Sequence, residues 1–216
     1  DQFASVFGQA GKLMRLDCRS REFEYFPFDP KGYQLVLVNS KVKHELVGSP
    51  YNDRRRSCEN VVAAIAAQFP DRHFETLRDA EWTDLEAVRN KVSEEDYSRA
   101  HYVLGEKARV LAVCEALNQG DYETVGQKMY ETHDGLSNEY DVSCEELDFL
   151  NDVARECGVT GSRIMGGGFG GCTINLVKEE RYDHFVEEVT KRFAAKYGHA
   201  PEVYPVVISD GSHKVC

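Results

Sequence analysis

The feature that constrains this chain most is a cluster of five glycines around one phenylalanine. The cluster consists of Gly166, Gly167, Gly168, Phe169, Gly170 and Gly171. Each glycine costs about 0.5–1 kcal/mol relative to alanine, because it loses more conformational freedom on folding, and a plain hairpin turn needs only one or two. The cluster therefore indicates positive φ angles, close approach of another backbone segment, or a row of N–H groups that binds an anion. It favours a functional loop and leaves a tight structural crossing open.

Two well-known phosphate-binding loops do not fit this cluster. A Walker loop ends in Gly-Lys-Ser/Thr, whereas Cys172 and Thr173 follow Gly171. The spacing of Gly166, Gly168 and Gly171 matches the dinucleotide pattern GxGxxG, but that loop must open a helix. The stretch TINLV after the cluster has the character of a strand, so the context excludes a dinucleotide fold.

The order of periodic segments predicts an α+β fold. Strands are predicted at 12–18, 22–28, 34–39, 162–165, 172–177 and 202–208, and helices at 82–91, 97–117, 122–132, 144–157 and 179–197. A further helix starts at Ser49 and Pro50, which suit an N-cap and a first helical position, and runs to about Phe69. Its VVAAIAA stretch is apolar all round, so we expect it to be buried. Strand, strand, helix and strand after a helical middle favour α+β over a doubly wound sheet.

Composition excludes several classes of function. The net charge of −11 argues against nucleic-acid binding, and no apolar run approaches the ~20 residues of a membrane helix. The 7 cysteines include no CxxC pair, which predicts free thiols and a cytoplasmic location. No histidine pair has zinc-ligand spacing, so we expect no metal site within this chain.

Two groups of polar residues have both a structural and a functional interpretation. Residues 54–56 are three arginines in the first turns of a predicted helix. We favour their pairing with Asp53 and Glu59 over a positive rim beside an anionic ligand. Tyr51, just inside the same N-terminus, could offer a hydroxyl to a polar ligand. His133 is interpreted as a structural histidine near Asp134.

Six segments of the sequence resemble the galactokinase family of GHMP kinases. The string GSRIMGGGFGGCT at 161–173 resembles the third signature motif of that superfamily. The others are DQFASVFG (1–8), DCRS (17–20), LVGSPYNDRRRSC (46–58), VSCEELD (142–148) and DGSHKV (210–215). They occur in the family's order and span essentially the whole chain, so we interpret residues 1–216 as the C-terminal part of a galactokinase.

The resemblance implies a specific reaction. Galactokinases use ATP and Mg²⁺ to phosphorylate the anomeric hydroxyl of α-D-galactose, which gives galactose 1-phosphate and ADP. By position, Asp1 would be the catalytic carboxylate and Tyr51 a sugar contact. The glycine cluster would line the floor of the site. Whether Asp1 is a general base or an electrostatic orienter stays open. The implied fold is a GHMP kinase C-terminal lobe, with helices packed on a ferredoxin-like antiparallel sheet.

Some family features are absent or altered. The motifs that hold the sugar and cradle ATP do not occur, so we expect the ATP and Mg²⁺ sites to lie mostly on an absent N-terminal lobe and the isolated chain to be inactive. We expect residues up to about 48 to pack with that lobe, and the surface it would cover could drive dimers. Met165 replaces a frequent threonine and Ser137 a frequent arginine. The alternatives are a kinase for N-acetylgalactosamine, arabinose or another sugar, a non-catalytic sugar-sensing relative, and a plain ferredoxin-like binding module.

Overall fold

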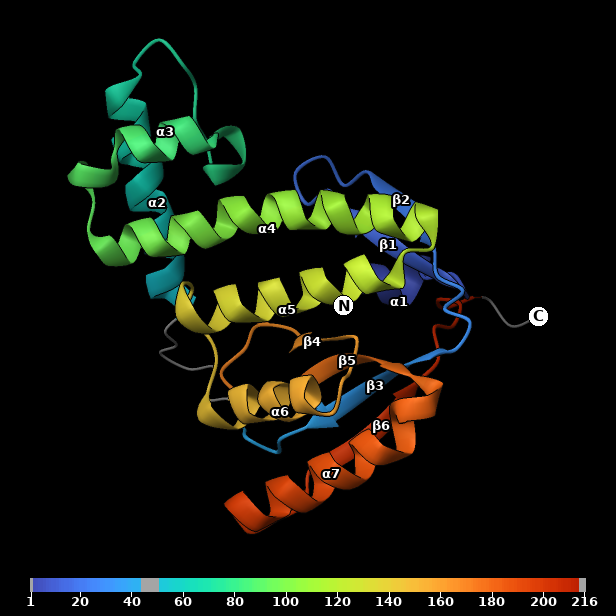
Figure 1. Ribbon diagram of the computed structural model, residues 1–216. Helices are drawn as coiled ribbons and strands as arrows, with labels where there is room; N and C mark the ends of the chain where they lie inside the picture. The colour runs from blue at the N-terminus through green and yellow to red at the C-terminus, as the bar shows by residue number, and fades with distance from the viewer. Residues whose placement is uncertain (1, 44–50, 214–216) are drawn as a thin grey trace.

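A four-stranded antiparallel sheet forms the centre of the molecule (Figure 1). The computed structural model describes residues 2–43 and 51–213. The strands are β3 (Tyr33–Asn39), β4 (Gly161–Ile164), β5 (Cys172–Lys178) and β6 (Glu202–Val206), in the spatial order β4-β5-β3-β6. With α7 (Glu179–Tyr197) between β5 and β6, this is the split β-α-β-β-α-β arrangement of ferredoxin-like folds. The predicted α+β class and antiparallel sheet are confirmed.

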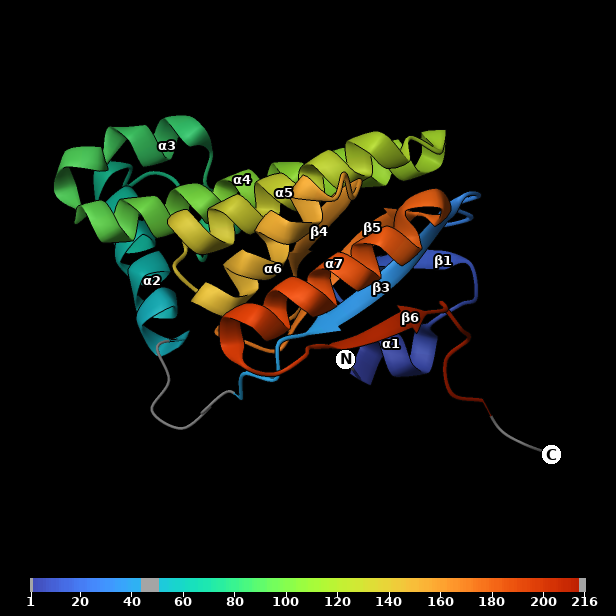
Figure 2. The same ribbon diagram turned by 60° about the horizontal axis from the view of Figure 1, so that its bottom comes forward.

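Two helices cover one face of this sheet. They are α6 (Glu145–Glu156) and α7, which lie side by side in Figure 2. Val36 and Val38 of β3 pack with Leu150, Phe185 and Phe193, which are all buried. The helix predicted at 179–197 has the predicted ends, because Gly198 adopts φ +77° and terminates it.

The long antiparallel helices α4 (Glu94–Gln119) and α5 (Tyr122–Asn138) cover the second face. Leu35 and Leu176 point to that side and join a cluster with Leu117 and Val125. Helix α5 lies unusually close to β4, since a Cβ on Gly126 would be 2.2 Å from the Thr160 carbonyl oxygen. Only glycine at that position allows this approach.

Residues 51–119 form a helical unit, part of which projects beyond the sheet (Figure 1). It contains α2 (Tyr51–Gln68), the short 3₁₀ helices η1 (Leu77–Asp79) and η2 (Arg89–Lys91), α3 (Trp82–Ala87) and α4. The helix predicted at 82–91 is therefore divided into α3 and η2. The expectation that VVAAIAA is buried all round is wrong, because Val61 and Ile65 are buried whereas Ala63 and Ala67 are exposed. Exposed alanines cost little, so one apolar face is enough for α2. Ser49 and Pro50, its predicted start, lie outside the described residues.

A hairpin of β1 (Lys12–Leu16) and β2 (Phe23–Pro27) carries the first helix, α1 (Gln2–Phe7). Phe3 and Phe7 of α1 pack on Phe23, with ring centroids 5.2 and 5.4 Å apart. The Tyr25 hydroxyl also donates a hydrogen bond to the Phe7 carbonyl. Hairpin and helix therefore form one aromatic unit. Within residues 2–43 and 51–213, none of the helices has the length and apolar character needed to cross a membrane.

Candidate functional site

The glycine loop connects β4 to β5 and has a backbone that few other residues tolerate. Gly166 and Gly168 both adopt φ +82°, Gly170 adopts +130° and Gly171 adopts +79°. Phe169 is itself left-handed, with φ +57°. Side chains other than glycine rarely adopt these angles, so backbone conformation accounts for four of the five glycines.

Close approach of two other backbone segments adds a second requirement. A Cβ on Gly168 would lie 2.1 Å from the Val142 carbonyl oxygen, and one on Gly170 would lie 2.9 Å from the Val42 carbonyl oxygen. The Phe169 N–H donates to the Val142 carbonyl, and the Gly171 N–H donates to that of Val42 at 3.2 Å. These two N–H groups therefore already have acceptors within the protein. Together with the close approaches, this makes the loop a tight crossing of backbone segments at Gly168 and Gly170.

Tyr51, the first residue of α2, contacts this loop. Its ring meets the Phe169 ring edge-on, with centroids 5.2 Å apart, and its hydroxyl donates to the Gly168 carbonyl at 3.3 Å. A Cβ on Gly167 would lie 3.0 Å from the same hydroxyl. Two sets of residues singled out in the sequence are therefore in contact. Asp1, the third, lies outside the described residues.

Arg54 connects α2 to the segment of residues 140–142 and to the loop. It is 6% exposed, and its guanidinium lies 5.2 Å from the centre of the Phe169 ring. Its Nε donates to the Tyr140 carbonyl at 3.1 Å, and its Nη2 donates to the Asp141 carboxylate at 2.6 Å and to the Asp141 carbonyl. We call the contacts among Arg54, Phe169 and residues 140–142 the inner junction.

The inner junction was missed by the sequence interpretation of residues 54–56. Pairing with neighbouring acids is confirmed for Arg55, whose Nε lies 2.7 Å from Glu59, and for Arg56, which lies 3.4 Å from Asp53. Arg54 instead pairs with Asp141, a residue 87 positions away. One usable signal was its position, because residues 51 and 54 lie on the same side of a helix.

A polar cluster holds the other side of this segment. The Asp148 carboxylate accepts hydrogen bonds from Ser143 at 2.5 Å and from Ser137 at 3.0 Å, and it lies 3.2 Å from His133 Nε2. Burial raises the pKa of Asp148, but the hydrogen bonds from these three side chains outweigh burial and hold it below its ordinary value. Ser143, next to the Val142 that contacts the loop, is thereby attached to α6, and the same carboxylate contacts Ser137 and His133 of α5.

The structural interpretation of His133 needs one correction. The histidine is buried, but its carboxylate partner is Asp148. Asp134 points elsewhere and pairs with Arg155 at 2.5 Å. Neighbours in sequence on a helix point in different directions, so the next residue along α5 was a poor candidate.

The described residues also bear on metal binding. Across residues 2–43 and 51–213, no cluster of three or more histidine, cysteine, aspartate or glutamate side chains is arranged to hold a metal ion.

Comparisons with known proteins agree with this architecture. A sequence model of the family described as "GHMP kinases C terminal" matches residues 114–195. The chain is 38% identical to human galactokinase over 100% of its own length and 53% of that protein. It is 37% identical to the galactokinase of Thermotoga maritima, of which it covers 59%.

Solved structures give the same result. The Lactococcus lactis galactokinase complexed with galactose superimposes with a TM-score of 0.91 and 27% identity, over 100% of this chain and 55% of that one. A mevalonate kinase of L. major, with a TM-score of 0.51 and 21% identity, shares the fold alone. Residues 114–195 therefore form a C-terminal domain of the GHMP kinase type. The chain is homologous to the galactokinases and corresponds to their C-terminal part, spanning little more than half of their length.

Proposed function

We propose that this chain supplies the acceptor side of a galactokinase active site. The parent enzyme would transfer the γ-phosphoryl group of ATP to the anomeric hydroxyl of α-D-galactose. The observation that carries this proposal is the contact of Tyr51 with the glycine loop, 117 positions later in the chain. Two separate segments that resemble the family meet there, as a shared substrate site requires.

The geometry suits phosphoryl transfer, which depends mainly on positioning and charge stabilisation. The Tyr51 hydroxyl donates to Gly168 and keeps lone pairs that can accept a hydrogen bond from a sugar hydroxyl. The inner junction fixes the loop beneath it. We assign to Asp1 the role of accepting or orienting the proton of the attacking hydroxyl. The anomeric oxygen loses that proton and forms the new bond to phosphorus, while the bond from phosphorus to ADP breaks.

ATP, when bound, supplies the phosphoryl group, and Mg²⁺ would neutralise its phosphates. We propose that their sites lie mostly on polypeptide outside this chain, because the relatives are almost twice as long. A coupled assay for ADP release tests this. We expect no galactose-dependent turnover by residues 1–216, and turnover once the parent's preceding segment is joined to them. Turnover by the isolated chain would contradict the proposal.

A kinase for another sugar is the second candidate, and Met165 favours testing it. This residue, where relatives often have threonine, is 40% exposed at the start of the glycine loop. Galactose, N-acetylgalactosamine and arabinose should be compared side by side in the parent protein, with Met165→Thr as the matched variant. We expect galactose to have the highest kcat/KM. Sugar binding without turnover of any sugar would instead indicate a non-catalytic sugar-sensing relative.

We further propose a cytoplasmic location, which six free cysteines among the described residues support. Dimerisation stays a prediction, as does packing of residues up to about 48 on an N-terminal lobe. The apolar side chains of Val6 and Val207 are 54% and 84% exposed, which supports testing both predictions. Within that first segment, β3 is an inner strand of the sheet described here.

A further inference from the structure

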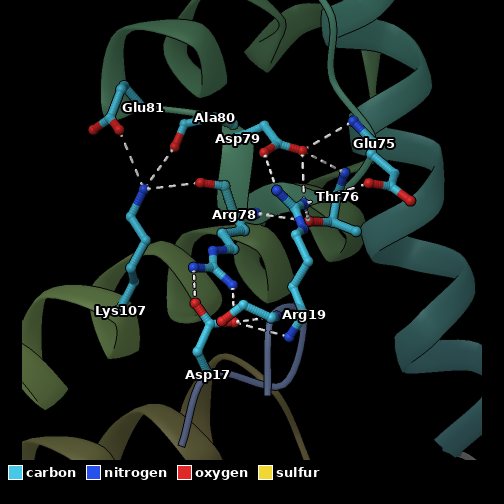
Figure 3. A network of polar contacts seen from close by, with 10 residues as sticks. Asp17, Arg19, Glu75, Thr76, Arg78, Asp79, Ala80, Glu81 and Lys107 are labelled. Carbon is cyan, nitrogen blue, oxygen red and sulfur yellow. Dashed lines mark hydrogen bonds and ion pairs between the residues drawn. The ribbon is translucent and has the colours of Figure 1, made fainter. Parts of the chain in front are cut away.

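Two residues of the DCRS motif form a reciprocal pair of arginine–aspartate contacts with Arg78 and Asp79 (Figure 3). Asp17 and Arg19 lie in the turn between β1 and β2. Both carboxylate oxygens of Asp17 accept hydrogen bonds from the Arg78 guanidinium. In the opposite direction, Arg19 donates to the two oxygens of Asp79 at 2.8 and 3.0 Å. We call these four residues the clasp.

Both ends of the clasp are built to hold their carboxylates in place. Asp17 accepts the N–H groups of Arg19 and Ser20 at 2.8 and 3.1 Å, which fixes it within the turn. Asp79 accepts the N–H groups of Glu75 and Thr76, each at 3.0 Å. The contacts with Arg78 and Arg19, the largest cause in each case, hold the pKa values of both aspartates well below their usual range.

The helical unit holds its end of the clasp rigidly. Arg78 and Asp79 belong to η1, which Thr76 caps by accepting the Arg78 N–H at 3.2 Å. Lys107 of α4 donates to the carbonyls of Ala80 at 3.0 Å and Arg78 at 3.4 Å. The clasp therefore joins the hairpin to the element that also contains α2 and Tyr51.

The hairpin carries α1 on its other side. The aromatic contacts of Phe3 and Phe7 with Phe23 attach the helix to β2. The residues after β6 hold its other flank, since Gly211 N–H donates to the Gly8 carbonyl at 2.8 Å and Ser212 N–H to that of Ser5 at 2.7 Å. Helix α1 begins at residue 2, directly after Asp1.

We propose that Asp17, Arg19, Arg78 and Asp79 are positioning residues that set the orientation of α1 relative to the helical unit that carries Tyr51. The side chains of Arg19 and Arg78 are 43% and 48% exposed. Exposed ion pairs contribute little to stability, whereas paired two-point contacts in opposite directions restrict rotation of one segment against another. The geometry of the clasp is therefore suited to fixing the orientation of the hairpin and α1 relative to the helical unit. The inference rests on the proposed function only for the effect of this orientation on catalysis.

Amide hydrogen exchange on residues 1–216 tests the mechanical part without any kinase activity. In the double variant Arg19→Gln/Arg78→Gln, we expect Gly8, Gly211 and Ser212 amides to exchange about tenfold faster, because local opening of α1 becomes easier. Amides of α6 and α7 should not change. The control is Arg15→Gln, which removes a 2.5 Å pair with Glu24 inside the same hairpin and leaves Asp17, Arg19, Arg78 and Asp79 unchanged. Faster exchange in the hairpin turn alone would show a merely local role and overturn the proposal.

Steady-state kinetics of the parent kinase test the effect of the α1 orientation on catalysis. We expect the double variant to lower kcat by about a hundredfold, as small misplacements of a reacting group do, with KM for the sugar nearly unchanged. Arg78→Lys should recover part of kcat, and Arg15→Gln should match the wild type. An unchanged kcat beside faster α1 exchange would exclude the positioning role, whereas a wild-type parent without turnover would refute the proposed function and leave the exchange result valid. If the double variant does not fold, the same two experiments are carried out on Arg19→Gln and Arg78→Gln separately, with the same expected outcomes.

Discussion

The inner junction and the clasp use the same chemistry in opposite surroundings. In both, an arginine reaches a carboxylate that is distant in sequence, over 87 residues for Arg54 and 61 for Arg78. The Arg54 side chain is 8% exposed, whereas that of Arg78 is 48% exposed. A buried guanidinium has lost water and depends on its protein acceptors, but an exposed one regains water when its partner is removed. The comparison teaches that similar contacts have different roles. In the inner junction they hold the glycine loop in place, whereas in the clasp they set the orientation of the hairpin relative to the helical unit.

The largest effect should come from breaking the inner junction at Val142. Gly168→Ala places a methyl group 2.1 Å from the Val142 carbonyl oxygen at φ +82°. We expect it to lower the free energy of unfolding by at least about 3 kcal/mol, from backbone strain and steric overlap together. Gly166→Ala is the matched control, because it has the same φ but nothing within 4 Å, and it should cost about 1–2 kcal/mol. Equal losses in urea unfolding would contradict the close-approach explanation.

Removing the buried guanidinium should have the next largest effect. Arg54→Met leaves the Tyr140 and Asp141 carbonyls without their donor, and we expect a loss of about 2–3 kcal/mol in the free energy of unfolding. Arg55→Met on the same helix removes an exposed pair with Glu59, and it should cost less than about 0.5 kcal/mol. Urea denaturation of both variants measures the difference. An equal loss of unfolding free energy in the two variants would mean that the burial of Arg54 does not make its contacts more important for stability than those of Arg55.

The clasp should contribute less to stability and respond more to salt. Arg78→Gln is expected to lower the free energy of unfolding by less than Arg54→Met does. Its deficit relative to the wild type should shrink in about 1 M NaCl, where the screening length is only about 3 Å, whereas the deficit of Arg54→Met should persist. Thermal unfolding at low and high salt measures both. If the stability deficit of Arg78→Gln did not change with salt, the clasp would resemble the inner junction in its energetics and the proposed difference between them would be wrong.

The smallest expected effect is a dependence of the unfolding free energy on acid pH that arises from the two aspartates of the clasp. The folded-state pKa values of Asp17 and Asp79 lie below the ordinary aspartate value. The stabilisation is therefore complete above about pH 5 and is lost progressively as pH falls below it, because the unfolded chain takes up these protons more readily than the folded protein. Asp79→Asn should weaken this acid dependence of the unfolding free energy between about pH 5 and pH 3, and Arg19→Gln should do the same. An unaltered dependence in both variants would exclude the clasp as its source.

Local signals in the sequence predicted the elements well. The predicted ends of α7 agree with the structure. The helix predicted at 97–117 begins earlier, at Glu94, because the Ser93 side chain caps it by accepting the Asp96 N–H at 3.0 Å. Partners across the fold could not be predicted in this way. The pairs of Arg54 with Asp141 and His133 with Asp148 depend on how α2, α5 and α6 pack together, and no local pattern encodes that. The glycine cluster lies between these cases, because its unusual backbone was foreseen but its partners Val42 and Val142 were not.

The position of β3 in the sheet has a consequence for how the protein is made. Asn175 of β5 donates to the Val36 carbonyl of β3 at 3.0 Å, across 139 residues of chain. At about 5–20 residues per second, β3 leaves the ribosome on the order of ten seconds before either neighbouring strand exists. Pairing over such a separation also closes slowly. During biosynthesis the apolar strand is thus uncovered while the helical unit forms, and this interval is when the nascent chain is most exposed to aggregation.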